Sequence, residues 1–191
     1  MSFYKTGFMR GIAAQFFGTI AGMLFVMLMR VIAGLNAYER EPVIVGGAAI
    51  GAIAFLFGVG VFNDWIKWTK GESTIDHHEI DPEKPSWWRY FNVDYDHKII
   101  GVQYGVTSII VLGLGGIFAL FFRWELAQAG ITFLNNPIFE MLFGHKGSDL
   151  YNTFMSLHGM VMIASILIGV GAMVNYLVPL QIGANDMAFP R

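Results

Sequence analysis

The chain has 191 residues, of which 55% are hydrophobic and only 14% are charged, and its mean hydropathy is +0.54. Soluble domains carry about 25% charged residues, so this composition excludes an ordinary soluble domain. The net charge of −2 offers no basic surface for nucleic acid, and the lack of cysteine excludes disulfides, iron–sulfur ligation and thiolate metal sites within these residues.

Four stretches of the chain are long and apolar enough to cross a membrane as helices. A hydrocarbon layer of about 30 Å needs about 20 residues of helix. The stretches are residues 11–29, 43–62, 99–122 and 154–177, and none contains Asp, Glu, Lys or Arg. They lack the alternation of a membrane barrel. We therefore predict an all-α fold, a polytopic transmembrane bundle with four spans that is part of a larger multi-helix subunit.

The segments between these stretches are polar, and they differ in length. Residues 30–42 form a short turn, and Pro179 closes the fourth span. Residues 123–153 form a second connection, with a helix-like patch at 137–143. The long segment 63–98 has aromatic residues near its ends, which are typical of membrane-interface anchors: Trp65, Trp68, Trp87, Trp88 and Tyr90.

The distribution of Lys and Arg predicts the orientation of the chain, because these residues favour the cytoplasmic side. With the N-terminus inside, eight of the twelve basic residues lie on the inner side: Lys5, Arg10, Lys67, Lys70, Lys84, Arg89, Lys98 and Arg191. The outer side then holds Arg30, Arg40, Arg123 and Lys146. We therefore expect a cytoplasmic N-terminus.

Glycine pairs four residues apart recur in the spans. They are Gly18/Gly22, Gly47/Gly51 and Gly101/Gly105. Such small-xxx-small spacing lets two helices approach closely. Ordinary helix packing explains these pairs at least as well as any special role.

His158 is the one histidine inside a predicted span. Ionisable residues at membrane depth are costly and usually functional, although a neutral imidazole can also simply hydrogen-bond a neighbouring helix. Both interpretations stay open from this residue alone. Mostly small residues share its face of the fourth span (positions 158, 162, 165, 169 and 172) and one face of the third (positions 101, 105, 108, 112, 116 and 119). We expect these faces to leave room for a flat, bulky group.

Five other polar residues besides His158 could carry chemistry. Arg123 continues the small face of the third span, and we expect it at a depth similar to that of His158, where a cation suits a ligand with anionic or polar edges, such as a haem. Its simpler interpretation is snorkelling to lipid headgroups. Asn175 and Asp186 could belong to a proton path, although an Asp in this context is usually a turn residue. His77 and His78 are a weak candidate for a divalent metal site.

Four segments in the second half of the chain carry a family resemblance. Asp96-His97-Lys98-Ile99-Ile100-Gly101 opens the third span, and Arg123-Trp124-Glu125-Leu126 follows it. Leu150-Tyr151-Asn152 leads toward His158, and the longest and most specific block, NYLVPLQIGANDMAFPR, occupies residues 175–191. In this order the segments resemble the start of subunit I of the haem–copper oxidases, the cytochrome c oxidase family. The resemblance covers about half of the chain.

The resemblance implies a role for six residues. His158 matches one of two axial ligands of a low-spin haem, most often of type a, and Arg123 matches an arginine near the edge of that haem. Glu125 and Gly130 match residues of a calcium or sodium site found in some members. Asn175 and Asp186 match residues of a proton path that has the aspartate at its inner mouth. The spacing of 17 positions between His158 and Asn175 is two shorter than in typical members, which puts a gap or bulge difference in this helix.

The resemblance also implies the function of the whole. It predicts part of the catalytic subunit of a respiratory terminal oxidase, which takes electrons from a cytochrome c or a quinol and reduces oxygen to water with proton pumping. The high-spin haem, the copper centre and the second axial ligand are expected in the rest of subunit I. Expected partners are that remainder, other oxidase subunits and the lipid bilayer of a bacterial inner membrane, and no nucleic acid.

Residues 1–95 do not match the usual start of the subunit. We interpret them as two additional transmembrane helices plus a cytoplasmic linker, and residues 96–191 as the first two conserved helices. The alternative is a non-catalytic membrane scaffold subunit of a respiratory complex, in which His158 only packs against another helix. A carrier with bis-histidine haem fits poorly, because it needs a second histidine within the spans.

Overall fold

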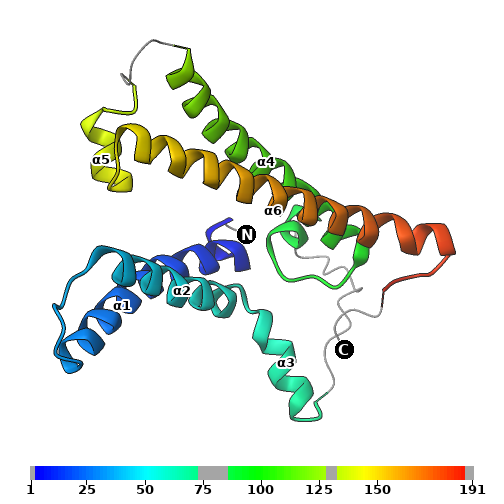
Figure 1. The fold of residues 1–191 in the computed structure, drawn as a ribbon. Helices are drawn as coiled ribbons and strands as arrows, with labels where there is room; N and C mark the ends of the chain where they lie inside the picture. The colour runs from blue at the N-terminus through cyan, green and yellow to red at the C-terminus, as the bar shows by residue number, and fades with distance from the viewer. Residues whose placement is uncertain (1–2, 73–85, 128–132, 188–191) are drawn as a thin grey trace. The chain divides into compact units, whose positions relative to one another are not determined.

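The computed structural model describes residues 3–72, 86–127 and 133–187, and every regular element in them is a helix (Figure 1). The elements are η1 (Phe3–Lys5), α1 (Gly7–Ile32), α2 (Arg40–Val59), α3 (Val61–Thr69), η2 (Ser86–Phe91), α4 (His97–Leu126), α5 (Pro137–Phe143) and α6 (Gly147–Ile182). Helices α1, α2, α4 and α6 are long and apolar enough to cross a membrane. The predicted all-α fold with four candidate spans is therefore confirmed.

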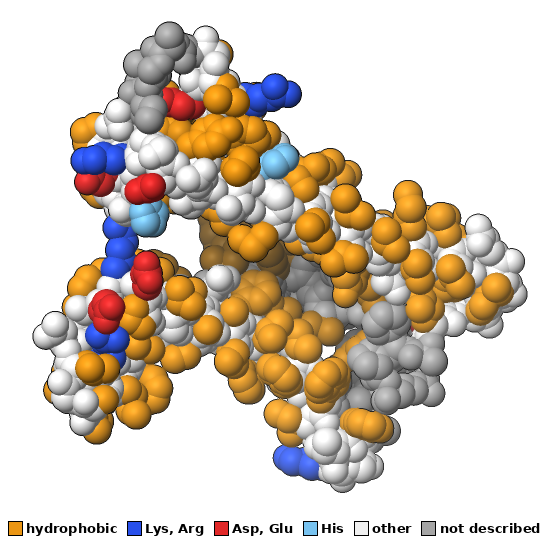
Figure 2. Space-filling model, viewed as in Figure 1, with side chains coloured by type: hydrophobic (Ala, Val, Ile, Leu, Met, Phe, Trp, Pro, Cys, Tyr) orange, Lys and Arg blue, Asp and Glu red, His pale blue; other side chains and the backbone are white. Residues whose placement is uncertain are grey.

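The chain divides into two compact units, one reaching from the N-terminus to Ile99 and the other from Ile100 to Met187. In both, hydrophobic side chains cover much of the visible helix surface, and charged side chains gather mainly toward helix ends and connections (Figure 2). This is the pattern expected of helices that face lipid rather than water. The division of the chain at residue 95 into added and conserved helices stays a prediction.

Two predicted span limits differ from the structure. The second span was expected to reach Phe62, but α2 ends at Val59 because Gly60 adopts a left-handed conformation with φ of 95°. The fourth was expected to close at Pro179, which instead lies inside α6, three residues before its end. Proline removes one backbone hydrogen bond there, a loss that membrane helices tolerate because neighbouring groups satisfy the freed carbonyl.

Helices α1 and α2 pack through the glycines that the sequence pattern singled out. A Cβ atom added at Gly51 would lie 2.0 Å from the Thr19 hydroxyl and 3.0 Å from the Gln15 carbonyl oxygen. A Cβ atom at Gly22 would lie 3.1 Å from the Cα atom of Gly47. The two backbones are therefore as close as small residues allow, which is the packing predicted from the glycine spacing.

An aromatic cluster holds the start of α1 to η2. The ring of Phe3 lies 5.0 Å from the ring of Phe91 and 6.2 Å from that of Trp87, measured between centroids. The backbone N–H of Gly7 donates to Oδ1 of Asn92 at 2.7 Å. These contacts fix the segment that leads into α4 against the first turn of α1.

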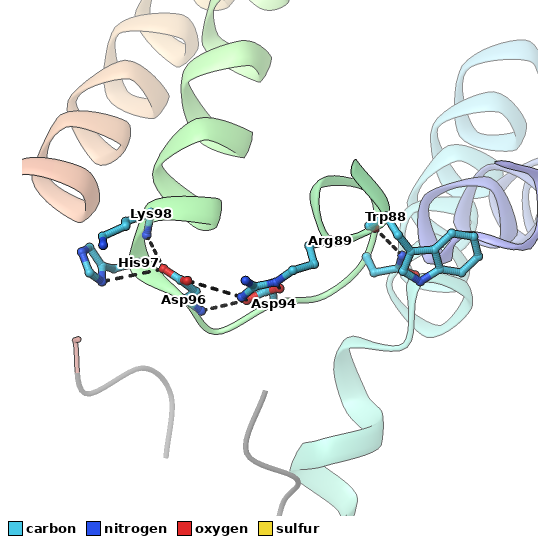
Figure 3. A network of polar contacts seen from close by, with 7 residues as sticks. Trp88, Arg89, Asp94, Asp96, His97 and Lys98 are labelled. Carbon is cyan, nitrogen blue, oxygen red and sulfur yellow. Dashed lines mark hydrogen bonds and ion pairs between the residues drawn. The ribbon is translucent and has the colours of Figure 1, made fainter. Parts of the chain in front are cut away.

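The start of α4 is organised by an ion-pair network that the sequence analysis did not identify (Figure 3). The guanidinium of Arg89 donates to both carboxylate oxygens of Asp94, at 2.6 and 2.9 Å. Asp96 accepts from the backbone N–H of Lys98 at 2.9 Å and so caps the first turn of α4. The hydrogen bond to Asp94 raises the pKa of Arg89 above its ordinary value, so this cation keeps its charge at any practical pH.

We predict that Gly51→Ala weakens the α1–α2 packing. The Thr19 hydroxyl can rotate away from the new methyl group, but the Gln15 carbonyl belongs to the backbone, so the helices must separate. We expect a loss of about 1–3 kcal/mol in the free energy of unfolding, measured by circular dichroism in mixed detergent micelles.

The matched control is Gly113→Ala in α4, where an added Cβ meets no described atom within 4 Å. Both variants share the small change in helix propensity, so their difference reports the packing alone. Equal stabilities of the two variants would contradict the close α1–α2 contact.

Candidate functional site

Helices α4 and α6 lie side by side along the small faces predicted from the sequence (Figure 1). A Cβ atom at Gly101 would lie 2.8 Å from Cβ of Tyr176, and one at Gly105 would lie 3.8 Å from Cβ of Ala172. In a membrane, where apolar contact with lipid is as favourable as contact with another helix, such close approach is a principal source of helix association.

Two serines form the polar centre of this interface. The hydroxyl of Ser108 donates to the Ser165 carbonyl oxygen at 2.9 Å, and the hydroxyl of Ser165 donates to the Ser108 carbonyl oxygen at 3.0 Å. The pair thus satisfies both hydroxyls inside the bundle, where water is absent. The reciprocal bonds also fix the register of α4 against α6.

One prediction about this interface fails over most of its length. The small faces were expected to leave room for a flat, bulky group, but from Gly101 to Gly115 the two helices fill that space with each other, and of the predicted face of α4 only Gly116 is shown to meet no described atom within 4 Å. A Cβ atom at Gly115 would lie 3.1 Å from the sulfur of Met162. Small residues here serve helix approach, so any large group must lie outside the α4–α6 seam.

The same register places His158 against a backbone carbonyl of α4. Its Nδ1 atom lies 2.9 Å from the carbonyl oxygen of Gly115. A carbonyl only accepts hydrogen bonds, so Nδ1 carries the hydrogen and donates it. The neutral imidazole then has its free lone pair on Nε2, which is the tautomer and orientation typical of a metal-binding histidine. His158 itself is half-buried.

Aromatic rings support the imidazole from one side. The Phe122 ring meets the His158 ring edge to face, with centroids 5.6 Å apart, and also meets Tyr151 at 5.9 Å. Beyond them lies a cluster around the fully buried Leu134, Leu150 and Phe154. Packing of this kind limits rotation of the ring and so holds Nε2 in one direction.

The surface next to His158 is open at two glycines. A Cβ atom added at Gly159 or at Gly116 would meet no described atom within 4 Å. The space available to a flat group therefore lies over these glycines, outside the α4–α6 seam.

Arg123 lies in the last turn of α4, directly after Phe122, whose ring contacts His158. Its side chain is exposed. Its exposure leaves the guanidinium accessible to the edge of a ligand or to lipid headgroups.

Glu125 is buried at the end of α4, with 7% of its surface exposed. Its Oε2 atom accepts the backbone N–H groups of Phe133 and Leu134, both at 3.1 Å. The carboxylate therefore holds the backbone of residues 133 and 134 at the end of α4. Gly130 and the pair His77 and His78 lie outside the described residues. No three His, Cys, Asp or Glu side chains form a metal-binding group in the part of the chain that the structure describes.

The two proton-path candidates lie near the other end of α6. Asn175 is buried, and its amide donates to the carbonyl oxygen of Gly171, one turn earlier, at 2.8 Å. Asp186 follows Gly183, whose left-handed conformation ends α6, and its Oδ1 atom accepts the N–H of Met187 at 2.7 Å. Asp186 is half-buried, so its carboxylate reaches solvent only in part.

Sequence reasoning missed the immediate partners of His158. The Gly115 carbonyl belongs to the backbone, so no side-chain motif predicts its contact with His158. Only the spacing of Ser108 and Gly115, two helical turns apart on one face, could have indicated which part of α4 faces His158.

Comparison with known proteins identifies the second half of the chain. Residues 99–191 match the family described as Cytochrome C and Quinol oxidase polypeptide I. Cytochrome c oxidase subunit 1 of Thermostichus vulcanus is 44% identical over 115 residues, which cover 58% of this chain and 19% of that protein. The same subunit of Synechocystis sp. is 42% identical over 106 residues, 55% of this chain and 17% of the relative.

A third relative extends the similarity toward the N-terminus. Cytochrome c oxidase polypeptide 1 of Halobacterium salinarum is 34% identical over 160 residues, which cover 78% of this chain and 24% of that protein. A match of this extent reaches into residues 1–98, so part of the N-terminal unit has a counterpart there. No solved structure matches the chain.

The chain spans about a fifth of the length of these curated relatives. The family match covers residues 99–191. These residues contain the antiparallel helices α4 and α6 and most of the predicted motifs. Residues 99–191 are therefore a segment of subunit I of the haem–copper oxidases.

Proposed function

We propose that this chain forms part of the catalytic subunit of a terminal oxidase that takes electrons from a cytochrome c and reduces oxygen to water with proton pumping. Within it, His158 serves as one axial ligand of the low-spin haem, of type a. The observation that carries this proposal is the hydrogen bond between Nδ1 of His158 and the Gly115 carbonyl, which leaves the Nε2 lone pair available to a metal. The family match and the names of the relatives support the oxidase as a whole.

The residues around His158 fit a haem ligand. Donation from Nδ1 to a carbonyl makes the imidazole a stronger electron donor at Nε2, and the ring of Phe122 holds its plane. When bound, the haem supplies a one-electron couple, whose potential the axial ligands and the burial of the site tune. The glycines 116 and 159 leave the neighbouring surface open for a flat macrocycle.

Arg123 would stabilise the polar edge of the haem. Its exposed guanidinium follows Phe122 in the chain and lies at the same end of α4. A fixed positive charge near the macrocycle favours the form with one more electron, so we propose that Arg123 raises the potential of this centre.

Asp186 and Asn175 would take up protons. We propose that Asp186 collects protons from the inner side, since it is half-buried just beyond the end of α6. The buried amide of Asn175, further along the helix, would hold water that passes them onward. This role requires the cytoplasmic N-terminus that the Lys and Arg distribution predicts.

Glu125 and Gly130 would contribute to a calcium or sodium site. The buried carboxylate accepts two backbone N–H groups through Oε2, and its oxygen atoms are ligands of the kind that calcium binds in proteins. The remaining ligands would be oxygen atoms, which calcium prefers.

The other redox groups of the enzyme belong to the remainder of the subunit. We propose that it supplies the second axial ligand, the high-spin haem and the copper centre, and that further oxidase subunits join it in a bacterial inner membrane. The four candidate spans and the oxidase relatives support a multi-pass membrane protein.

We predict that His158→Ala in the complete oxidase abolishes the absorption of the low-spin haem. The control, His145→Ala, removes an exposed imidazole in the turn before α6 and leaves the spectrum unchanged. The absorption of the low-spin haem is measured in optical spectra of the reduced enzyme. An unaltered low-spin band in His158→Ala, with the protein folded, would favour the scaffold alternative.

For Asp186→Asn we expect slower turnover with both haems retained. A positioned proton-transfer group contributes about 10²-fold or more to a rate, and the amide cannot carry the proton. Asp149→Asn, in the first turn of α6 at its opposite end, serves as the control and keeps normal turnover. Proton uptake in reconstituted vesicles is the readout, and full uptake by the Asp186 variant would contradict the role.

If a cation binds at Glu125, calcium should slow hydrogen exchange at the amides of Phe133 and Leu134. The bound calcium would fix the Glu125 carboxylate, to which both amides donate. Glu125→Gln should exchange faster and lose the calcium effect, whereas Glu140→Gln in the exposed part of α5 should keep it. Exchange measured by mass spectrometry with and without a chelator tests this. Calcium-independent exchange in the unaltered chain would exclude the site.

A further inference from the structure

Helix α3 begins directly where a candidate span ends. α2 finishes at Val59, Gly60 turns the chain through its left-handed conformation, and α3 starts at Val61. Figure 1 shows α3 leaving the axis of α2 at this turn. A helix attached to a span by a single residue has to lie within a few ångströms of the membrane surface, so its side chains meet either lipid or the first layer of water.

The two sides of α3 differ sharply in polarity. With 100° of rotation per residue, its apolar side chains fall within an arc of about 160° and its polar ones lie opposite. The apolar side holds Val61, Phe62, Trp65, Ile66 and Trp68, together with Thr69. The hydroxyl of Thr69 donates to the Ile66 carbonyl oxygen at 2.9 Å, so its hydrogen needs no water molecule as acceptor.

Most of the apolar side is not covered by the described part of the chain. Phe62 packs back on Phe57 of α2, with ring centroids 4.6 Å apart. Beyond it, Trp65 is 47% exposed, Ile66 47% and Trp68 60%. Two exposed indole rings beside a span have the preference for the headgroup layer that tryptophan shows, because each ring is apolar and its N–H needs a polar partner.

The opposite side of α3 holds Asn63 and Asp64 by sequence position, and two cations lie there, Lys67 inside the helix and Lys70 at its C-cap. Their ammonium groups complement the phosphates of lipid headgroups, and their long side chains allow the charge to stay above the apolar layer. The same end of the α1–α2 pair holds the aromatic cluster of Phe3, Trp87 and Phe91, since a Cβ atom at Gly7 would lie 2.9 Å from the Val59 carbonyl oxygen. Aromatic rings thus gather where α2 leaves the bilayer.

We propose that α3 is an interfacial lipid-binding helix, lying along the membrane surface with Trp65 and Trp68 among the acyl chains and Lys67 and Lys70 at the phosphates. Lipid is the occupant that the observations favour over protein, because the position of α3 at the end of a span, its indole rings and its opposed lysines all match one layer of a bilayer. This role is independent of haem binding and of oxygen chemistry.

The absence of cysteine from these residues makes spin labelling a direct test. The single variants Ile66→Cys and Thr69→Cys carry a label on the apolar side, and Asn63→Cys and Lys70→Cys carry a label on the polar side. The full chain is reconstituted in vesicles of phosphatidylcholine and phosphatidylglycerol, and collisions of each label with oxygen and with a water-soluble nickel chelate are measured. We expect an oxygen-to-nickel ratio several-fold higher at 66 and 69 than at 63 and 70.

Two results would overturn the proposal. Equal nickel accessibility at all four positions means a helix in water, and protection of 66 and 69 from both oxygen and nickel means a face covered by protein. As a second measurement, the double variant Trp65→Ala and Trp68→Ala, labelled at 69, should lose most of the oxygen preference. An unchanged ratio in that variant would contradict anchoring by the indole rings.

Discussion

The close antiparallel approach of α4 and α6 is the constraint on which the candidate site depends. Glycine, alanine and serine on both faces bring the backbones together, and the reciprocal Ser108–Ser165 hydrogen bonds fix their register. Only in that register does the Gly115 carbonyl meet Nδ1 of His158. The tautomer of a single imidazole is thus set by helix packing several turns long, which explains why small residues occupy the seam.

The two ends of this helix pair have different surroundings. The difference matches the proposed roles, haem ligation at one end and proton uptake at the other. At the C-terminal end of α4, the ring of Phe122 packs on His158, and Glu125 is buried one turn further along the helix. Near the other end, Asn175 is buried inside α6, and Asp186 lies half-buried just past its end. A haem ligand benefits from a fixed orientation, whereas proton uptake needs a carboxylate that still reaches water.

The sequence alone predicted the helical class and the four candidate spans, because span length and charge are read directly from composition. The limits of the spans were less predictable. Gly60 ends α2 early by adopting a left-handed conformation, and α6 continues past Pro179. The direction of the small faces was misjudged, since spacing shows which residues share a face but not which neighbour covers it. The Gly115 carbonyl and the Arg89–Asp94 pair depend on tertiary contacts that no local pattern contains.

The central claim is that helix packing presents Nε2 of His158 to a haem iron while Nδ1 stays bound to the Gly115 carbonyl. A density map of the complete oxidase tests it most directly. The account predicts a macrocycle over Gly116 and Gly159, outside the α4–α6 seam, with its iron bonded to Nε2. A map in which lipid or a side chain of another helix occupies that surface, and Nε2 meets no iron, would contradict it.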